Sequence, residues 1–135
     1  MKARPLALAA AAMLAGCEAL DRQPAPATVS IASLYQRPPE RSLINALRLY
    51  EEGNFERAEQ SFRSAVIQGL ADWRDVAVAH KYLAFIACAF NRTADCEQQF
   101  RNAFAADRDF RLTDAEIGHP LWGPVYRRVA AGVKK

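Results

Sequence analysis

Apolar residues recur at helical intervals once the chain passes Pro39. One amphipathic run covers residues 43–50 and a second covers residues 55–66, with Gly53 and Asn54 between them. Apolar positions spaced three and four residues apart are typical of a helix with one buried face. Gly favours the backbone that ends a helix, and Asn favours the position that begins one. The pattern therefore predicts two antiparallel helices joined by a tight turn.

A second helical hairpin is predicted from the same spacing further along the chain. Apolar residues step by three and four over residues 76–90, the pattern breaks at residues 91–93, and it resumes over residues 96–104. The hairpins also match position by position, because five residues of the first recur 38 residues later with similar side chains. The matched pairs are Ala46 with Ala84, Gly53 with Asn91, Ala58 with Cys96, Phe62 with Phe100, and Ala65 with Ala103.

This repeat resembles the tetratricopeptide repeat, a helical hairpin with small, Gly and aromatic residues at fixed positions. The first unit fits that signature, whereas the second has Asn91 at the turn, Thr93 in place of the aromatic residue and Cys96 in place of an Ala. The units lie 38 residues apart, where about 34 is usual. We expect the extra residues to lie in the connector over residues 69–73.

The segment beyond the second hairpin predicts a cap, which two repeats need because they rarely bury a core alone. Thr113 and Glu116 have the spacing of a capping box. Pro120 suits a first helical turn, and apolar residues then recur at helical intervals over residues 121–129. We expect Trp122 to pack over the open face of the second hairpin; the alternative is an exposed aromatic that binds a partner.

The N-terminal residues 1–16 have the layout of a secretory signal peptide. A positive start is followed by an apolar run over residues 6–14 and by small residues before Cys17. The run is shorter than the roughly 20 apolar residues that a membrane-spanning helix needs. Leu14-Ala15-Gly16-Cys17 resembles the lipobox of bacterial lipoproteins, which implies cleavage before Cys17 and acylation of its thiol and its new amino group.

Acylated Cys17 would anchor the mature chain in a membrane, because stable anchoring takes more than one acyl chain and a lipobox cysteine carries several. Glu18 follows the cysteine, which by the same resemblance implies the outer membrane, facing the periplasm, with the inner membrane as the less favoured address. Residues 17–41 hold four prolines and no sustained helical period. They predict a Pro-rich tether between the anchor and the folded part.

Length and charge limit the choice of fold and partner. Removal of the signal leaves 119 of 135 residues, enough for one small domain. We predict an all-α domain over residues 42–130, made of two tetratricopeptide-like hairpins and a C-terminal capping helix, with a basic tail over residues 131–135. The formal charge of +3 falls to +1 when Lys2 and Arg4 leave with the signal. So small a charge gives no support to a nucleic-acid partner.

The remaining cysteines, Cys88 and Cys96, lie symmetrically about Arg92 in the predicted turn of the second hairpin. In an antiparallel helix pair their side chains are placed to meet, so we predict a disulfide. Two buried free thiols are the alternative, and a redox pair is a weaker one because no C-x-x-C motif is present. His80 and His119 lack the spacing of a metal site and are expected at the surface or at helix ends.

Catalytic motifs are absent from the sequence: no Ser-His-Asp order, Gly-rich phosphate loop or paired carboxylate set stands out. We therefore expect no enzyme, no cofactor and no metal. Stacked hairpins leave a concave face lined by the first helix of each pair. The residues predicted to line this partner groove are Leu43, Leu47, Tyr50, Lys81 and Phe85. The alternative is that these apolar residues are simply part of the core.

Several segments together resemble the TssQ-type lipoproteins associated with bacterial type VI secretion systems. They are Leu83 to Cys88, Cys96 with Phe100 and Ala103, Asp109-Phe110 with Leu112, and Glu116 with the tail from Gly118 to Val125. The resemblance covers residues 43–128 and implies Cys17 as the lipid site, a Cys88–Cys96 bridge and no catalytic residues. It implies a protein-protein interaction scaffold of the cell envelope, with secretion-machine membrane components as partners. A general envelope-assembly scaffold of the same fold is the alternative, and a thiol-redox protein is a weaker one.

Overall fold

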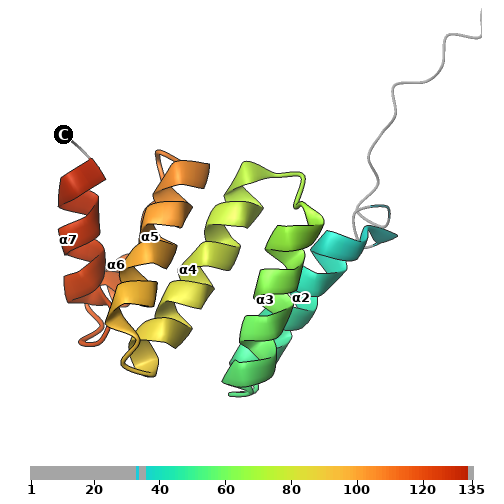
Figure 1. Cartoon of the computed structure of the whole chain (residues 1–135), viewed down its shortest axis with the longest axis horizontal. Coiled ribbons are helices and arrows are strands. Elements are labelled where there is room, and N and C mark those ends of the chain that lie inside the picture. Colours follow the sequence, from blue (N-terminus) through green and yellow to red (C-terminus); the bar gives the residue numbers. More distant parts are fainter. Residues whose placement is uncertain (1–32, 34–35, 134–135) are drawn as a thin grey trace, which may run out of the picture.

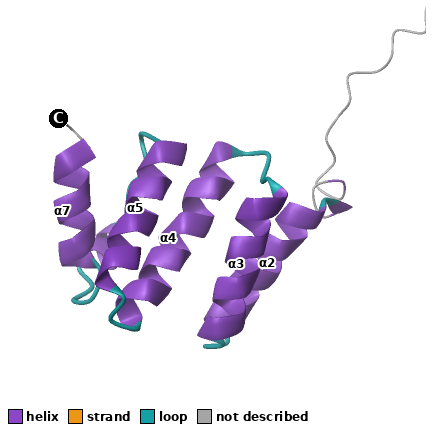
Figure 2. Ribbon diagram, in the orientation of Figure 1, coloured by secondary structure: helices purple, strands orange, loops and turns teal. Residues whose placement is uncertain are grey.

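The computed structural model describes residue 33 and residues 36–133, and this part of the chain is helical, with no strand (Figure 2). Its helices stand side by side in one row, with the start of the first and the end of the last on the same side of that row (Figure 1). They are α2 (Pro38–Glu51), α3 (Phe55–Gln68), α4 (Trp73–Ala89), α5 (Thr93–Ala106), α6 (Asp114–Ile117) and α7 (Gly123–Val133). The predicted all-α class is confirmed.

Neighbours in the chain are also neighbours in space. The pair α2 and α3 forms the first hairpin and the pair α4 and α5 forms the second, while α3 packs against α4 and α7 packs against α5. The short helix α6 contacts α7. The prediction of two tetratricopeptide-like hairpins followed by a C-terminal capping helix is thus confirmed, with α6 as an additional element between the second hairpin and the cap.

Both hairpin turns use the left-handed backbone that their sequences favour. Gly53 has a φ of 74° and Asn91 has a φ of 59°, a region that Gly enters freely and that Asn tolerates better than most residues. Asn54 occupies the first capping position of α3, but its side chain makes no capping hydrogen bond. The prediction that Asn54 begins this helix is confirmed, and the turn is closed by backbone hydrogen bonds such as Asn54 N–H to the Leu49 carbonyl.

The repeated positions form the contacts between paired helices. Phe62 and Phe100 have no exposed surface, and the same holds for the small residues around them: Ala46, Ala58 and Ala65 in the first hairpin, and Ala84, Cys96 and Ala103 in the second. Small side chains let the two helices approach closely, and each Phe fills the space that remains. Burial of one such ring contributes about 1.5 to 3 kcal/mol. The 38-residue repeat is therefore a repeat of packing.

The ends of the helical domain differ from the prediction. Helix α2 begins at Pro38, within the predicted tether, because proline is well suited to the first turn of a helix. At the other end, α7 continues to Val133, so part of the predicted basic tail is helical. Pro120 lies in the turn before α7 rather than in its first turn, which holds Pro124 instead.

Cys17, the predicted signal peptide and nearly all of the predicted tether lie outside the described residues. Within residue 33 and residues 36–133, no helix combines the length and the apolar character needed to cross a bilayer.

Candidate functional site

The predicted partner groove is largely buried. Leu43 is 6% exposed and Phe85 is 3% exposed, so neither is available to a partner and their assignment to a groove is wrong. Leu43 lies in the core between the first hairpin and α4, and Phe85 lies in the core of the second hairpin. The alternative interpretation, that these residues belong to the core, is correct for both.

Trp122 explains why Phe85 is covered. Its indole stacks on the Phe85 ring with centroids 4.3 Å apart, and its Nε1 donates a hydrogen bond to the Glu116 carbonyl oxygen at 2.8 Å. The His119 ring stacks on the other side, with a centroid distance of 3.4 Å. The segment between α6 and α7 therefore folds back onto α4, and Trp122 packs on the second hairpin as predicted.

Lys81 is held by α6, the helix that precedes this segment. Its ammonium lies 2.7 Å from a Glu116 carboxylate oxygen and 4.8 Å from the centre of the Tyr82 ring. Burial acts to raise the pKa of Glu116, but hydrogen bonds from Lys81 and from the Thr113 backbone outweigh it and lower that pKa. Glu116 is thus ionised at neutral pH, and the predicted capping box with Thr113 is present. Lys81 serves an internal ion pair rather than a free binding surface.

Tyr50 completes an aromatic seam across the two hairpins. Its ring lies edge-on to Tyr82 at 4.8 Å and to Phe55 at 5.3 Å. Burial, followed by the nearby Tyr82 and Glu116, raises the pKa of Tyr50, so its hydroxyl stays neutral at physiological pH. Tyr50 is half-buried, and so is Leu47, whose neighbour Ile44, three residues earlier, is 42% exposed.

The structure joins Cys88 and Cys96 in a disulfide, with an S–S distance of 2.06 Å and Cα atoms 5.2 Å apart. Cys88 lies in the last turn of α4 and Cys96 in the first turn of α5, so the bond closes the second hairpin at the turn that lacks a glycine. The cysteines are 7% and 0% exposed. Because thiol-disulfide exchange needs access for an attacking thiolate, this burial favours a structural bridge over a redox pair.

A network of four charged residues joins the two hairpins. The Arg92 guanidinium contacts Glu59 at 2.7 Å and Asp95 at 3.1 Å, while Arg63 contacts Glu59 at 2.8 Å and Asp95 at 3.3 Å. Hydrogen bonding from Arg92 is the largest influence on Glu59 and lowers the pKa of its carboxyl. This network was not predicted from the sequence, although Glu59 and Arg63 have the spacing of a helical ion pair.

His80 extends the network inward. It lies in the middle of α4, half-buried, and its Nδ1 is 2.8 Å from Gln99 Oε1; Gln99 Nε2 in turn donates to Asp95 at 3.0 Å. An amide oxygen only accepts, so His80 carries its proton on Nδ1. Burial lowers the pKa of His80. The expectation of a surface or helix-end histidine is wrong for His80, because it lies on the side of α4 that packs against Gln99 of α5.

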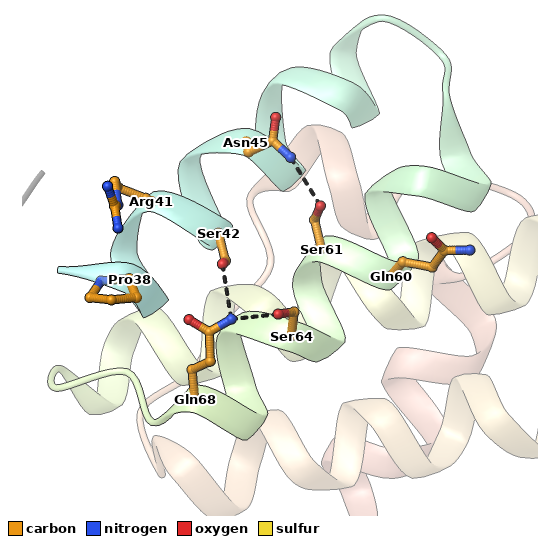
Figure 3. A pocket seen from close by; sticks show the side chains of 8 residues that line it. All are labelled: Pro38, Arg41, Ser42, Asn45, Gln60, Ser61, Ser64 and Gln68. Carbon is orange, nitrogen blue, oxygen red and sulfur yellow. Dashed lines mark hydrogen bonds between the residues drawn. The ribbon is translucent and has the colours of Figure 1, made fainter. Parts of the chain in front are cut away.

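A polar hollow of about 520 Å³ lies on the outer side of the first hairpin (Figure 3). Figure 3 shows that its polar side chains bond across α2 and α3: Asn45 donates to Ser61 at 3.0 Å, and Gln68 donates to Ser42 at 3.3 Å. These groups satisfy one another. The hollow is therefore the polar end of a helical array rather than a ligand site.

Metal chemistry finds no support among the described residues, which hold no group of three or more His, Cys, Asp or Glu side chains placed for an ion. Comparison of the chain with protein-family models, with curated proteins and with solved structures returned no match. What the described part of the chain offers chemically is a set of packed aromatic rings, ion pairs and a buried disulfide.

Proposed function

We propose that this chain is a lipid-anchored, protein-binding module of a bacterial envelope, attached to the outer membrane through Cys17 and facing the periplasm. The observation that carries the proposal is the division of the three cysteines. Cys88 and Cys96 are bonded to each other and buried, which suits an oxidising compartment outside the cytosol. The remaining cysteine, Cys17, follows the signal-like run and is left for the lipid.

Protein binding rather than catalysis is supported by charged side chains of the folded part whose partners are other residues of the same chain. The charged groups with altered pKa values include Glu59, Arg92 and Glu116, and their partners lie within the chain and hold its helices together. Arrays of helical hairpins present extended surfaces to other proteins. A stable, disulfide-closed array on a lipid anchor is well suited to assembling other envelope components.

An accessory role in type VI secretion is the specific form of the proposal. It comes from the resemblance to the TssQ-type lipoproteins, whose motif includes the tail from Gly118 to Val125. The structure supplies a physical reason for that tail, since His119 and Trp122 stack on α4 and Gly123 abuts the Ile117 carbonyl. These contacts hold the cap against the second hairpin.

Capture of the protein from its native envelope, after chemical cross-linking and with an antibody against the helical domain, tests the proposal. We expect membrane components of a type VI secretion apparatus in the captured material. Recovery of outer-membrane assembly or peptidoglycan-linked proteins alone would instead favour the general scaffold. Cys17→Ala is the matched variant for the anchor: it should remain an unprocessed precursor without lipid, and normal acylation of this variant would refute the anchoring proposal.

A further inference from the structure

Two adjoining hollows lie between the end of α5, the connector that follows it, and α7. Their volumes are about 390 and 400 Å³, and both are lined by Phe104 and Arg111. The ends of α5 and α7 lie on the same side of the helical row (Figure 1). We treat the two hollows as one feature, the basic groove, because Phe104 and Arg111 line both.

The charged residues that line the basic groove are all arginines. Arg108 lines one hollow, Arg127 lines the other, and Arg111 lines both. In the described part of the chain none of the three pairs with a carboxylate, whereas Arg92 and Arg128 elsewhere on the surface do. Asp107 and Asp109 occur in the same connector, but they do not line the groove, and Asp107 accepts a hydrogen bond from the Asp109 backbone at 2.8 Å.

Two of these arginines are held in place by backbone carbonyl oxygens. Arg111 donates to the Phe110 carbonyl at 2.9 Å, and Arg127 donates to the Ile117 carbonyl at 3.0 Å. A guanidinium has five N–H donors, so each keeps others for a ligand. The positive charge is thus partly preorganised and lacks a neutralising partner within the described residues.

The floor of the basic groove is apolar and rigid. Phe104 is 5% exposed and Tyr126 is 4% exposed, and their rings stack at 5.7 Å. Val133, at the rim, is 45% exposed. These rings are themselves covered, so an apolar side chain of a ligand would meet the exposed apolar residues of the lining, Ala105, Ala131 and Val133. The chain continues from Val133 with two lysines, which add to the positive charge at this end of the sequence.

We propose that the basic groove binds an acidic segment of a partner protein, with carboxylates on the three arginines and an apolar side chain against the exposed alanines and Val133 of its lining. The arginines are distributed along two hollows rather than gathered around one point, which fits a chain of spaced carboxylates better than a single phosphate group. This inference rests on the proposed function as a protein-binding module and names the chemistry of its partner.

Fluorescence anisotropy of the purified full chain with a labelled peptide of alternating Glu and Leu tests the proposal. We expect binding that weakens as salt is raised, and little binding of the matched peptide in which Gln replaces Glu. In the variant Arg111→Gln/Arg127→Gln we expect about tenfold weaker binding, because two of the three charge contacts are lost and each is weakened by its exposure to solvent. Circular dichroism of the variant confirms that it remains folded.

Arg57→Gln is the matched control, because Arg57 is an exposed arginine on α3, outside the basic groove. It should bind the Glu-Leu peptide as the unaltered chain does. Equal binding of the Glu and Gln peptides, or an equal loss in the Arg57 variant, would overturn the proposal. Displacement of the Glu-Leu peptide by inorganic phosphate at matched ionic strength would overturn it in favour of a phosphate or lipid-headgroup site.

Failure of this experiment is distinct from failure of the proposed function. If the peptide does not bind but cross-linking recovers secretion-machine components, the module binds its partner elsewhere and only the basic groove is rejected. If the peptide binds but capture recovers none of these components, the groove stands and the assignment to that apparatus falls.

Discussion

Trp122→Ala should weaken the fold by about 3 kcal/mol, at the lower end of the roughly 3 to 5 kcal/mol of a fully buried aromatic residue. The side chain is only half-buried, which reduces the apolar area at stake. Its removal eliminates two ring stacks, on Phe85 and His119, at about 0.5 to 1.5 kcal/mol each beyond area burial. It also leaves the Glu116 carbonyl without its indole donor, which costs about 1 kcal/mol.

Urea unfolding followed by far-ultraviolet circular dichroism measures this loss, since fluorescence would change with the number of tryptophans. Trp122→Phe keeps an aromatic ring on Phe85 and removes the hydrogen bond, so it should lose about 1 kcal/mol. Trp73→Ala is the control, because Trp73 is 48% exposed at the start of α4 and should cost under about 1 kcal/mol. Equal losses in the two alanine variants would refute the conclusion that Trp122 holds the cap against α4.

Three further predictions concern stability. Gly123→Ala should destabilise the chain by at least about 1 kcal/mol, because the new methyl would overlap the Ile117 carbonyl; Gly132→Ala, with open space around it, should be neutral or stabilising in the same urea assay. Cys88→Ala/Cys96→Ala should lower the free energy of unfolding by about 2 to 3 kcal/mol. In the unaltered chain, tryptic peptides on either side of the turn should separate only after reduction. His80 should make the urea midpoint fall as pH drops below about 6.5, because the unfolded chain then takes up a proton that the buried imidazole resists; His80→Gln should flatten the profile between about pH 6.5 and 5, and an unchanged profile would contradict this account.

The helical hairpins were predictable because their apolar spacing and turn residues act locally. Gly53 and Asn91 adopt the left-handed backbone that their positions in the repeat suggest, and each Phe of the repeat is buried. Trp122 was also placed correctly, since an apolar residue in a capping segment has the second hairpin as its nearest unfilled surface. The hairpin features follow from patterns that lie within a few helical turns of one another.

The partner groove was not predictable in the same way. Phe85 and Lys81 have the positions of groove residues within their own helix, but Glu116 and Trp122 cover them from a segment more than thirty residues away. A repeat pattern gives no information about a later segment that folds back. The network around Glu59 was missed for the same reason, because its partner Arg92 lies on the other hairpin.

The basic groove could not be predicted from any spacing of residues in the sequence. Arg111 precedes α6 in the chain and Arg127 follows it, and nothing in the sequence distinguishes either from an ordinary solvated arginine. Only the fold reveals that they line one surface and that no carboxylate of the described chain neutralises them. The helices and the packing within each hairpin were therefore predictable from the sequence, whereas the surface that we propose for binding was not.

The polar hollow between α2 and α3 affects how separate copies of the chain meet. Helical arrays with apolar ends add further units head to tail, and an interface of that kind continues into an open filament. Here the first hairpin ends in serine, asparagine and glutamine side chains that already bond to one another, so a second copy gains little by stacking on it. Copies held on the lipid anchor that we propose should therefore not add to one another through this hollow.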